Sequence, residues 1–232
     1  MNYSAILSGT LLIALMLSGC GATTTIDEYR PTTKAMQINS EESVVILGRR
    51  DAGHYDTDRE FIDCVAKKME GADIQVLPER QFIDSIYPWF EPRTAPKGLK
   101  RLTRLMKNPA IKKQVRNQKL RYLVWIDGST NTHDRGGSIS CAIGPGGGGC
   151  FGFAQWEKSS IYEAIVWDLS DLTEKGRLRV DSTGTSYLLG VVAPIPLLTP
   201  VKNDACTSLG KQLKQFFSVA TNSAQNNSDS SD

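Results

Sequence analysis

Residues 44–77 read VVILGRRDAGHYDTDREFIDCVAKKMEGADIQVL, and this segment predicts a strand, a helix and a second strand. Its β-branched opening run is closed by Gly48, as expected of a short buried strand. Thr57 begins a Thr-Asp-Arg-Glu sequence that predicts a capping box, and apolar residues then recur at helical spacing over 61–69. The second strand is expected at 74–77.

The pattern of strands and helices continues on the C-terminal side of this segment. The further elements expected are a helix at 82–86 that Pro88 must end, a basic helical pair over 97–119 whose second helix is capped by Asn108, three sequential antiparallel strands at 122–127, 161–168 and 177–187, and a helix at 204–217. The order βαβα, basic helical pair, βββ, α predicts an α+β or α/β fold. We expect a single mixed sheet with helices packed on it, in one domain over residues 41–217.

The N-terminus has the features of an export signal. Residues 6–17 form an apolar run that is too short to span a bilayer as a permanent helix. The run ends in Leu-Ser-Gly-Cys at 17–20, which resembles the bacterial lipobox. The resemblance implies a signal peptide over residues 1–19 and a diacylglyceryl group on Cys20. In lipoproteins of this kind an Asp after the cysteine commonly retains the protein at the inner membrane, so Gly21 favours the periplasmic side of the outer membrane.

Both ends of the mature chain are expected to lack packed structure. Residues 20–40 are rich in Thr and other polar residues, as in a flexible tether, and residues 218–232 are almost devoid of large apolar side chains. Between them, 40% hydrophobic and 22% charged residues over the whole chain are typical of a globular core. After Cys20 no run of residues is long and apolar enough for a transmembrane helix.

The remaining cysteines predict two disulfide bonds. An even number of cysteines in an exported chain favours pairing. Cys141 and Cys150 enclose a glycine-rich loop that can double back on itself, which leaves Cys64 to pair with Cys206. Zinc binding is the rival interpretation, but no cysteine pair has the CxxC spacing of a zinc site.

Catalytic and cofactor motifs are not recognised. His54 and His133 are the two histidines, and His133 lies in a polar stretch just after an expected strand end, where catalytic residues do occur. The glycine run at 144–149 lacks the Lys-Ser/Thr that a phosphate-binding loop requires. We therefore expect no cofactor and no metal, and we keep an envelope hydrolase or transferase with an unrecognised carboxylate or His133 site as the alternative function.

Two resemblances to known families rest on particular segments. The order of elements over 44–47, 61–69 and 74–80 is similar to the penicillin-binding-protein activator lipoproteins, the curli-secretion lipoprotein and the N-terminal domain of the Tol-system propeller protein. Residues 87–93 and 140–156 resemble a family of uncharacterised proteobacterial lipoproteins. The resemblances imply an envelope lipoprotein, and no activity follows from them.

Segregated positive charge is the main functional signal. Between residues 92 and 126 there are eleven Lys or Arg and no acid, although the whole chain carries only +2. We call this segment the basic block. Like charges at this density repel one another unless anions lie nearby. The candidate contact surface consists of Lys97, Lys100, Arg101, Arg104, Lys107, Lys112, Lys113 and Arg116.

The anion could come from three sources: phosphates of anionic lipid or lipopolysaccharide, an acidic envelope protein, or the acidic remainder of the domain itself. Nucleic acid is disfavoured by the compartment. A second candidate surface is the apolar, proline-bearing segment 188–201, in which proline is expected to prevent a regular ladder. This segment either covers the core as a lid or presents an apolar patch. The sequence thus predicts a lipid-anchored, non-enzymatic binding or accessory module for an envelope partner.

Overall fold

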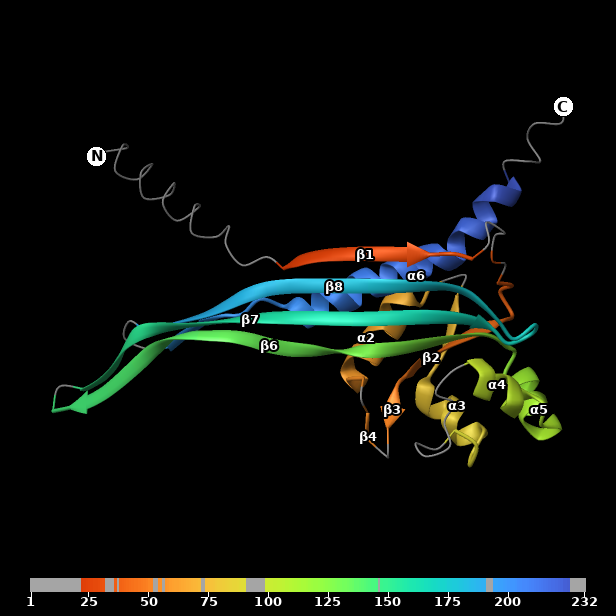
Figure 1. Ribbon diagram of the computed structural model, residues 1–232, viewed down its shortest axis with the longest axis horizontal. Coiled ribbons are helices and arrows are strands. Elements are labelled where there is room, and N and C mark those ends of the chain that lie inside the picture. The colour runs from red at the N-terminus through yellow and green to blue at the C-terminus, as the bar shows by residue number, and fades with distance from the viewer. Residues whose placement is uncertain are drawn as a thin grey trace. The chain divides into compact units, whose positions relative to one another are not determined.

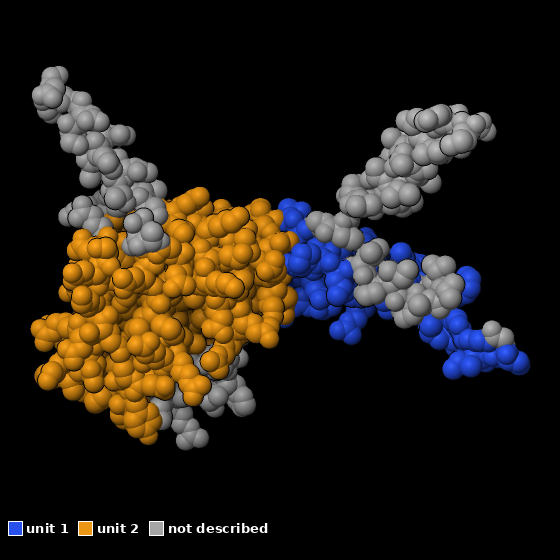
Figure 2. Space-filling model, turned by 180° about the vertical axis from the view of Figure 1, so that it is seen from behind, with its two compact units in different colours: residues 1–23, 131–159, 182–201 blue, residues 24–130, 160–181, 202–232 orange. Residues whose placement is uncertain are grey.

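The structure is a computed structural model that describes residues 22–31, 36, 38–51, 54–55, 57–71, 74–90, 99–145, 147–190 and 194–225. It divides into two compact units, coloured separately in Figure 2. The core unit comprises the described parts of 24–130, 160–181 and 202–232, and the hairpin unit those of 1–23, 131–159 and 182–201. Residues 41–217, expected to form one domain, contribute to both units.

A seven-stranded mixed sheet organises the fold, in agreement with the predicted α+β class. The strand order is β1-β8-β7-β6-β2-β5, with β9 paired to β8. Strand β2 is parallel to β5 and to β6. A separate ribbon joins β3 and β4. The strands are β1 (Thr23–Tyr29), β2 (Ser43–Gly48), β3 (Arg50–Asp51), β4 (His54–Tyr55), β5 (Gln75–Leu77), β6 (Leu120–Gly144), β7 (Gly147–Asp168), β8 (Thr173–Gly190) and β9 (Pro194–Leu197).

Helices cover both faces of the sheet in the core unit (Figure 1). Val44 and Ile46 of β2 pack into a first core cluster with α2 and α6. Val45 and Leu47 point to the opposite face and pack into a second core cluster with α3, α4 and α5. The helices are α2 (Arg59–Met69), α3 (Glu79–Ser85), α4 (Leu99–Met106), α5 (Pro109–Asn117) and α6 (Val201–Gln225). None of the helices in the described chain is both long and apolar enough to cross a membrane.

The start of α2 differs from the prediction by one residue. Asp58, not Thr57, is the N-cap, and its carboxylate accepts a hydrogen bond from the backbone N–H of Glu60. Thr57 is fully buried, and its hydroxyl donates to the backbone carbonyl of Ile126 at 3.1 Å. The predicted capping box was therefore wrong, because Thr57 satisfies a strand carbonyl rather than the helix. At α5 the predicted Asn108 cap is confirmed, with its side chain accepting from the N–H of Ala110.

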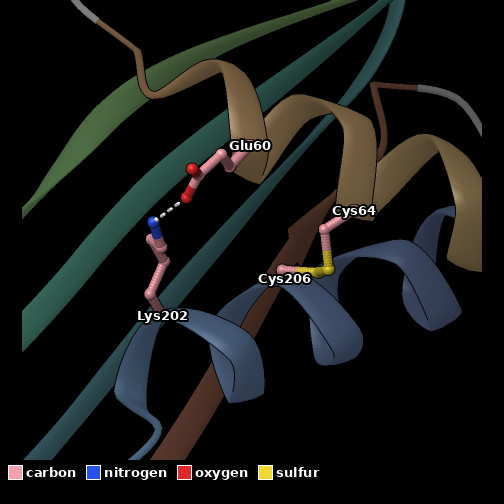
Figure 3. The surroundings of a disulfide bond; sticks show 4 residues. All are labelled: Glu60, Cys64, Lys202 and Cys206. Atoms are coloured by element: carbon pink, nitrogen blue, oxygen red, sulfur yellow. Dashed lines mark hydrogen bonds and ion pairs between the residues drawn. A yellow bond between two sulfur atoms is a disulfide. The ribbon is translucent and has the colours of Figure 1, made fainter.

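Both predicted disulfides are present, and one of them joins α2 to α6. Cys64 and Cys206 are bonded across a sequence separation of 142 residues (Figure 3). On the same two helices, Lys202 donates to Asp58 at 2.7 Å and to Glu60 at 3.0 Å. The second disulfide, Cys141–Cys150, closes the β6–β7 turn. The first bond and the ion pairs fix the two helices that cover the first core cluster.

Regular structure extends into both segments that were expected to lack it. Strand β1 lies within the expected tether and forms an edge of the sheet, where Ile26 packs against the first core cluster. At the other end, α6 continues to Gln225, beyond Phe217, where the predicted helix stops. The prediction of little structure over 20–40 was wrong for β1, because a strand at the edge of a sheet needs only a ladder partner and partial burial of a side chain such as Ile26.

Strands β6 and β7 are much longer than the predicted strands at 122–127 and 161–168. They run antiparallel, because Thr130 contacts Ser160 in the core unit and Cys141 is bonded to Cys150 in the hairpin unit. The added length is rich in Gly, Ser and Thr and lacks the apolar alternation on which the sequence analysis relied. Backbone hydrogen bonds between neighbouring strands form it instead.

The proline-bearing segment forms a strand, contrary to prediction. Strand β9 pairs antiparallel with β8, with Leu188 opposite Pro196 and Gly190 opposite Pro194. The two prolines stand at alternate positions of β9, so the N–H groups that they lack would both have pointed to the same side of the strand. The N–H of Ile195 between them points to the other side and can still donate toward β8. Proline is compatible with an edge strand for this reason.

We predict that Cys64→Ala/Cys206→Ala lowers the free energy of unfolding by about 2–5 kcal/mol, because a bridge over a long loop restricts the unfolded chain most. The matched control is Cys141→Ala/Cys150→Ala, whose closed loop spans a separation of only 9 residues and which should cost less. Urea unfolding of both variants measures the difference. Equal losses would contradict the prediction that the α2–α6 bridge stabilises the fold more than the short β6–β7 bridge.

The ion pair on the same helices predicts a pH effect. The hydrogen bond from Lys202 is the largest cause that holds the pKa of Asp58 below its ordinary value. The stabilisation from Asp58 is therefore complete above its unfolded pKa of about 3.9 and is lost as pH falls through the lower folded pKa. Lys202→Met should raise the pKa of Asp58 in an NMR titration and move acid unfolding to higher pH. Lys211→Met, at an exposed position of α6, should leave both unchanged.

Candidate binding site

Helices α4 and α5 carry most of the basic block. Their apolar residues Leu102, Met106, Ile111 and Val115 are buried in the second core cluster, so the charged residues between them are turned toward solvent. Lys97 lies outside the described residues. The other members of the predicted contact surface are all exposed, and we call them the α4/α5 cations: Lys100, Arg101, Arg104, Lys107, Lys112, Lys113 and Arg116.

The α4/α5 cations are not neutralised by the described part of the core unit. None of them forms a salt bridge or side-chain hydrogen bond with another described residue. The C-terminal end of the basic block differs. There Lys119 Nζ lies 3.0 Å from a Glu41 carboxylate oxygen, and Arg121 pairs with Glu42 at 3.5 Å and with Asp168 at 3.0 Å. Internal pairing thus accounts for the end of the block, whereas the cations of the two helices have no compensating acid among the described residues.

Asp168 is the buried centre of this internal pairing. Its carboxylate is 2% exposed and accepts from Arg121, from the backbone N–H of Ser170 at 2.8 Å and from the Ser170 hydroxyl at 2.7 Å. Lys175 lies 3.6 Å away. Burial disfavours the charged form of Arg121, but the hydrogen bond and charge of Asp168 outweigh burial, so the pKa of Arg121 is raised. These bonds fix the start of β6 against the β7–β8 turn.

A cavity of about 400 Å³ opens where α5, the start of β6 and the β7–β8 turn meet. All of its lining residues belong to the core unit. Ser170 adds a hydroxyl to the lining. The apolar lining consists of Met106, Val115, Leu120, Leu169 and Leu172. The charged lining consists of Lys112, Arg116, Lys119, Arg121 and Glu42. We call this cavity the amphipathic pocket, because apolar and positively charged side chains line it together.

Among the described residues, His133 forms no recognisable catalytic site. His133 is exposed in the hairpin unit, and its Nε2 lies 3.2 Å from the Ser159 hydroxyl. No carboxylate is bonded to His133 among the residues that the structure describes, so this pair lacks the third group that orients a catalytic histidine. His54 lies in β4. Within the described ranges no group of three or more His, Cys, Asp or Glu side chains could hold a metal ion.

The tip of the β6–β7 hairpin is an apolar surface that the sequence analysis missed. Ile143, Phe151 and Phe153 are 93%, 76% and 52% exposed. The disulfide Cys141–Cys150 lies among them. The available signal was the absence of any charged residue from 136 to 156. The other apolar candidate, segment 188–201, is in part a strand, and the burial of its β9 side chains lies outside the description.

Comparison with known proteins does not assign this chain to a family. No protein-family profile and no curated protein matches the sequence. Among solved structures, two PelC dodecamers from Paraburkholderia phytofirmans are similar at 12% and 11% identity, each with a TM-score of 0.38, covering 84% of this chain and 98% and 97% of theirs. A neuraminyllactose-binding hemagglutinin homolog from Helicobacter pylori has 10% identity and a TM-score of 0.35, covering 80% of this chain and 88% of its own. These similarities are too low to carry an activity.

We predict that Asp168→Asn lowers the free energy of unfolding by about 1–3 kcal/mol, because it removes the buried charge that Arg121 pairs with. The matched control is Asp171→Asn in the same turn. Asp171 also pairs with a cation, Lys175, but its side chain is 48% exposed, and its loss should change stability by less than about 1 kcal/mol. Thermal and urea unfolding of both variants measure the effect. Equal stability of the two variants would contradict the role given to Asp168.

Proposed function

We propose that this protein is a lipid-anchored cell-envelope lipoprotein that acts as a non-enzymatic binding module, with the α4/α5 cations as its contact surface. The observation that carries the proposal is the set of exposed cations without an ion pair to any described residue. An anionic surface would relieve the repulsion among these charges. Each Lys or Arg near an anionic bilayer contributes roughly 1 kcal/mol to binding.

The proposed location rests on two features of the chain. The apolar segment that ends in Leu-Ser-Gly-Cys resembles a lipoprotein signal, and Gly21 favours the outer membrane over the inner membrane. The structure contains two disulfides, which are typical of proteins in oxidising compartments outside the cytoplasm. An acylated Cys20 would hold the domain at a bilayer surface, since stable anchoring needs more than one acyl chain and a lipoprotein carries at least two.

The partner that we propose is the phosphate of anionic lipid or lipopolysaccharide. A protein tied to a membrane meets these phosphates at high local concentration, so weak contacts at several cations are sufficient. An acidic envelope protein offers the same charge, and it is the alternative outcome if the protein binds no anionic lipid.

We predict that reversing Lys100, Arg104 and Lys107 to Glu weakens binding to anionic phosphatidylglycerol vesicles by at least roughly a hundredfold, because loss of each cation costs about 1 kcal/mol and each new carboxylate adds repulsion. Folding stability should change little, because these side chains are exposed and form no ion pair with any described residue. The assay uses residues 20–232 carrying Cys20→Ser, so that no acyl chain anchors the protein, and binding of this parent protein should weaken as salt rises, since screening shortens to about 8 Å at physiological ionic strength. Vesicle co-sedimentation at several salt concentrations measures both effects.

The control makes the same charge change elsewhere on the core unit. Lys67, Lys68 and Lys211 are exposed on α2 and α6, and their reversal to Glu should affect vesicle binding much less. If both triple variants lose binding equally, net charge explains the binding and α4 is not the surface. If neither variant loses binding, the lipid proposal is wrong.

We also predict that Cys20→Ala leaves an unprocessed precursor without lipid, because the thiol is the acceptor of the diacylglyceryl group. Metabolic labelling with a radioactive fatty acid should mark the unaltered protein and not the variant. The matched control is Cys64→Ala, which removes a structural cysteine and should leave labelling intact. Normal labelling of the Cys20→Ala protein would refute the anchor.

A further inference from the structure

The amphipathic pocket combines positive charge with an apolar lining, and a purely electrostatic contact does not require the apolar lining. Lipid phosphates can be bound by exposed cations alone, as at Lys100 and Arg104. The pocket adds an apolar lining directly beside cations. We propose that it binds one single-chain anionic amphiphile, with the chain in the apolar lining and the anionic head group on Lys112 and Arg116. This inference rests on the proposed function and names the ligand class for one part of the same surface.

The apolar lining comes from four parts of the fold, one of which is Leu120 at the start of β6. Met106 ends α4, Val115 lies on α5, and Leu169 and Leu172 lie in the β7–β8 turn. Met106, Val115 and Leu169 also belong to the second core cluster, so the pocket is continuous with packed hydrocarbon. An acyl chain entering the pocket would leave water for an apolar surface. Each methylene buried there strengthens binding about fourfold.

The cations at the pocket are arranged for an anion. Lys112 and Arg116 are four residues apart on α5 and therefore lie on the same face of the helix. Neither has an ion pair with any described residue, whereas Lys119 and Arg121 are occupied by Glu41, Glu42 and Asp168. The lining carries four cations and one acid. Two cations thus remain available for a ligand, and arginine can bind a phosphate through two parallel hydrogen bonds.

The size of the pocket matches one chain rather than a membrane surface. A volume of about 400 Å³ lies within the 300–1,000 Å³ that is usual for small-molecule sites. The side chain of Asp168, held by Arg121 and Ser170, fixes the turn that supplies Leu169 and Leu172. The apolar lining is therefore formed before any ligand arrives, which lowers the entropy cost of binding.

The test uses the mature chain, residues 20–232 carrying Cys20→Ser, so that neither an acyl chain nor the apolar segment at 6–17 competes for the ligand, in buffer without detergent. Dodecyl phosphate below its micelle concentration is titrated by calorimetry. We expect one binding site, with binding weakened about fourfold for each methylene removed in the shorter alkyl phosphates. Arg116→Gln should weaken binding at least tenfold. The matched control is Lys113→Gln, which neutralises the next exposed cation on α5 but does not line the pocket and should leave binding unchanged.

Two further ligands test each half of the proposal. Dodecyl maltoside has the same chain without charge, and inorganic phosphate has the head group without the chain, so both should bind at least tenfold more weakly than dodecyl phosphate. If either binds as tightly, or if Lys113→Gln has the same effect as Arg116→Gln, the proposed amphiphile site is wrong. If dodecyl phosphate does not bind while anionic vesicles do, the pocket proposal fails and the binding surface stands. If it binds while vesicles do not, the membrane-surface proposal fails instead.

Discussion

Strand β2 buries side chains on both faces of the sheet, and the core unit depends on this double burial. Val44 to Leu47 are each at most 2% exposed. Because neighbouring side chains of a strand point to opposite faces, these four residues contribute to both core clusters. β2 is also the only strand of the described sheet that pairs in parallel with two others, β5 and β6. A polar residue in this run would remove an apolar side chain against which the helices on one face of the sheet pack.

The second core cluster determines where the positive charge appears. Apolar residues at helical spacing hold α4 and α5 against the sheet, and this leaves the cations on the outer faces of the two helices. At the end of the basic block, Arg121 turns inward to the buried Asp168. The same segment therefore supplies a structural ion pair and an uncompensated surface, and the amphipathic pocket lies where the two meet.

The covalent restraints act on different parts of the chain. The Cys64–Cys206 bond joins the first helix of the core unit to the last, across most of the sequence. The Cys141–Cys150 bond is local and closes the β6–β7 turn beside the exposed Ile143 and Phe151. The first disulfide thus stabilises the packing of the core unit, and the second stabilises the geometry of the uncharged hairpin tip.

The sequence by itself determined the elements whose burial is periodic, the Asn108 cap and the cysteine pairing, because these follow from local spacing and from a count of thiols. It did not determine the length of β6 and β7, the strands β1 and β9, or the cap of α2. Those depend on ladder partners and on Thr57 reaching Ile126, which are distant in sequence. The charge of the basic block could be read from the sequence, but the amphipathic pocket could not. Its lining joins residue 42, residues 106–121 and residues 169–172. Only the tertiary fold brings these segments together, so that apolar side chains lie beside Lys112 and Arg116, which pair with no described residue.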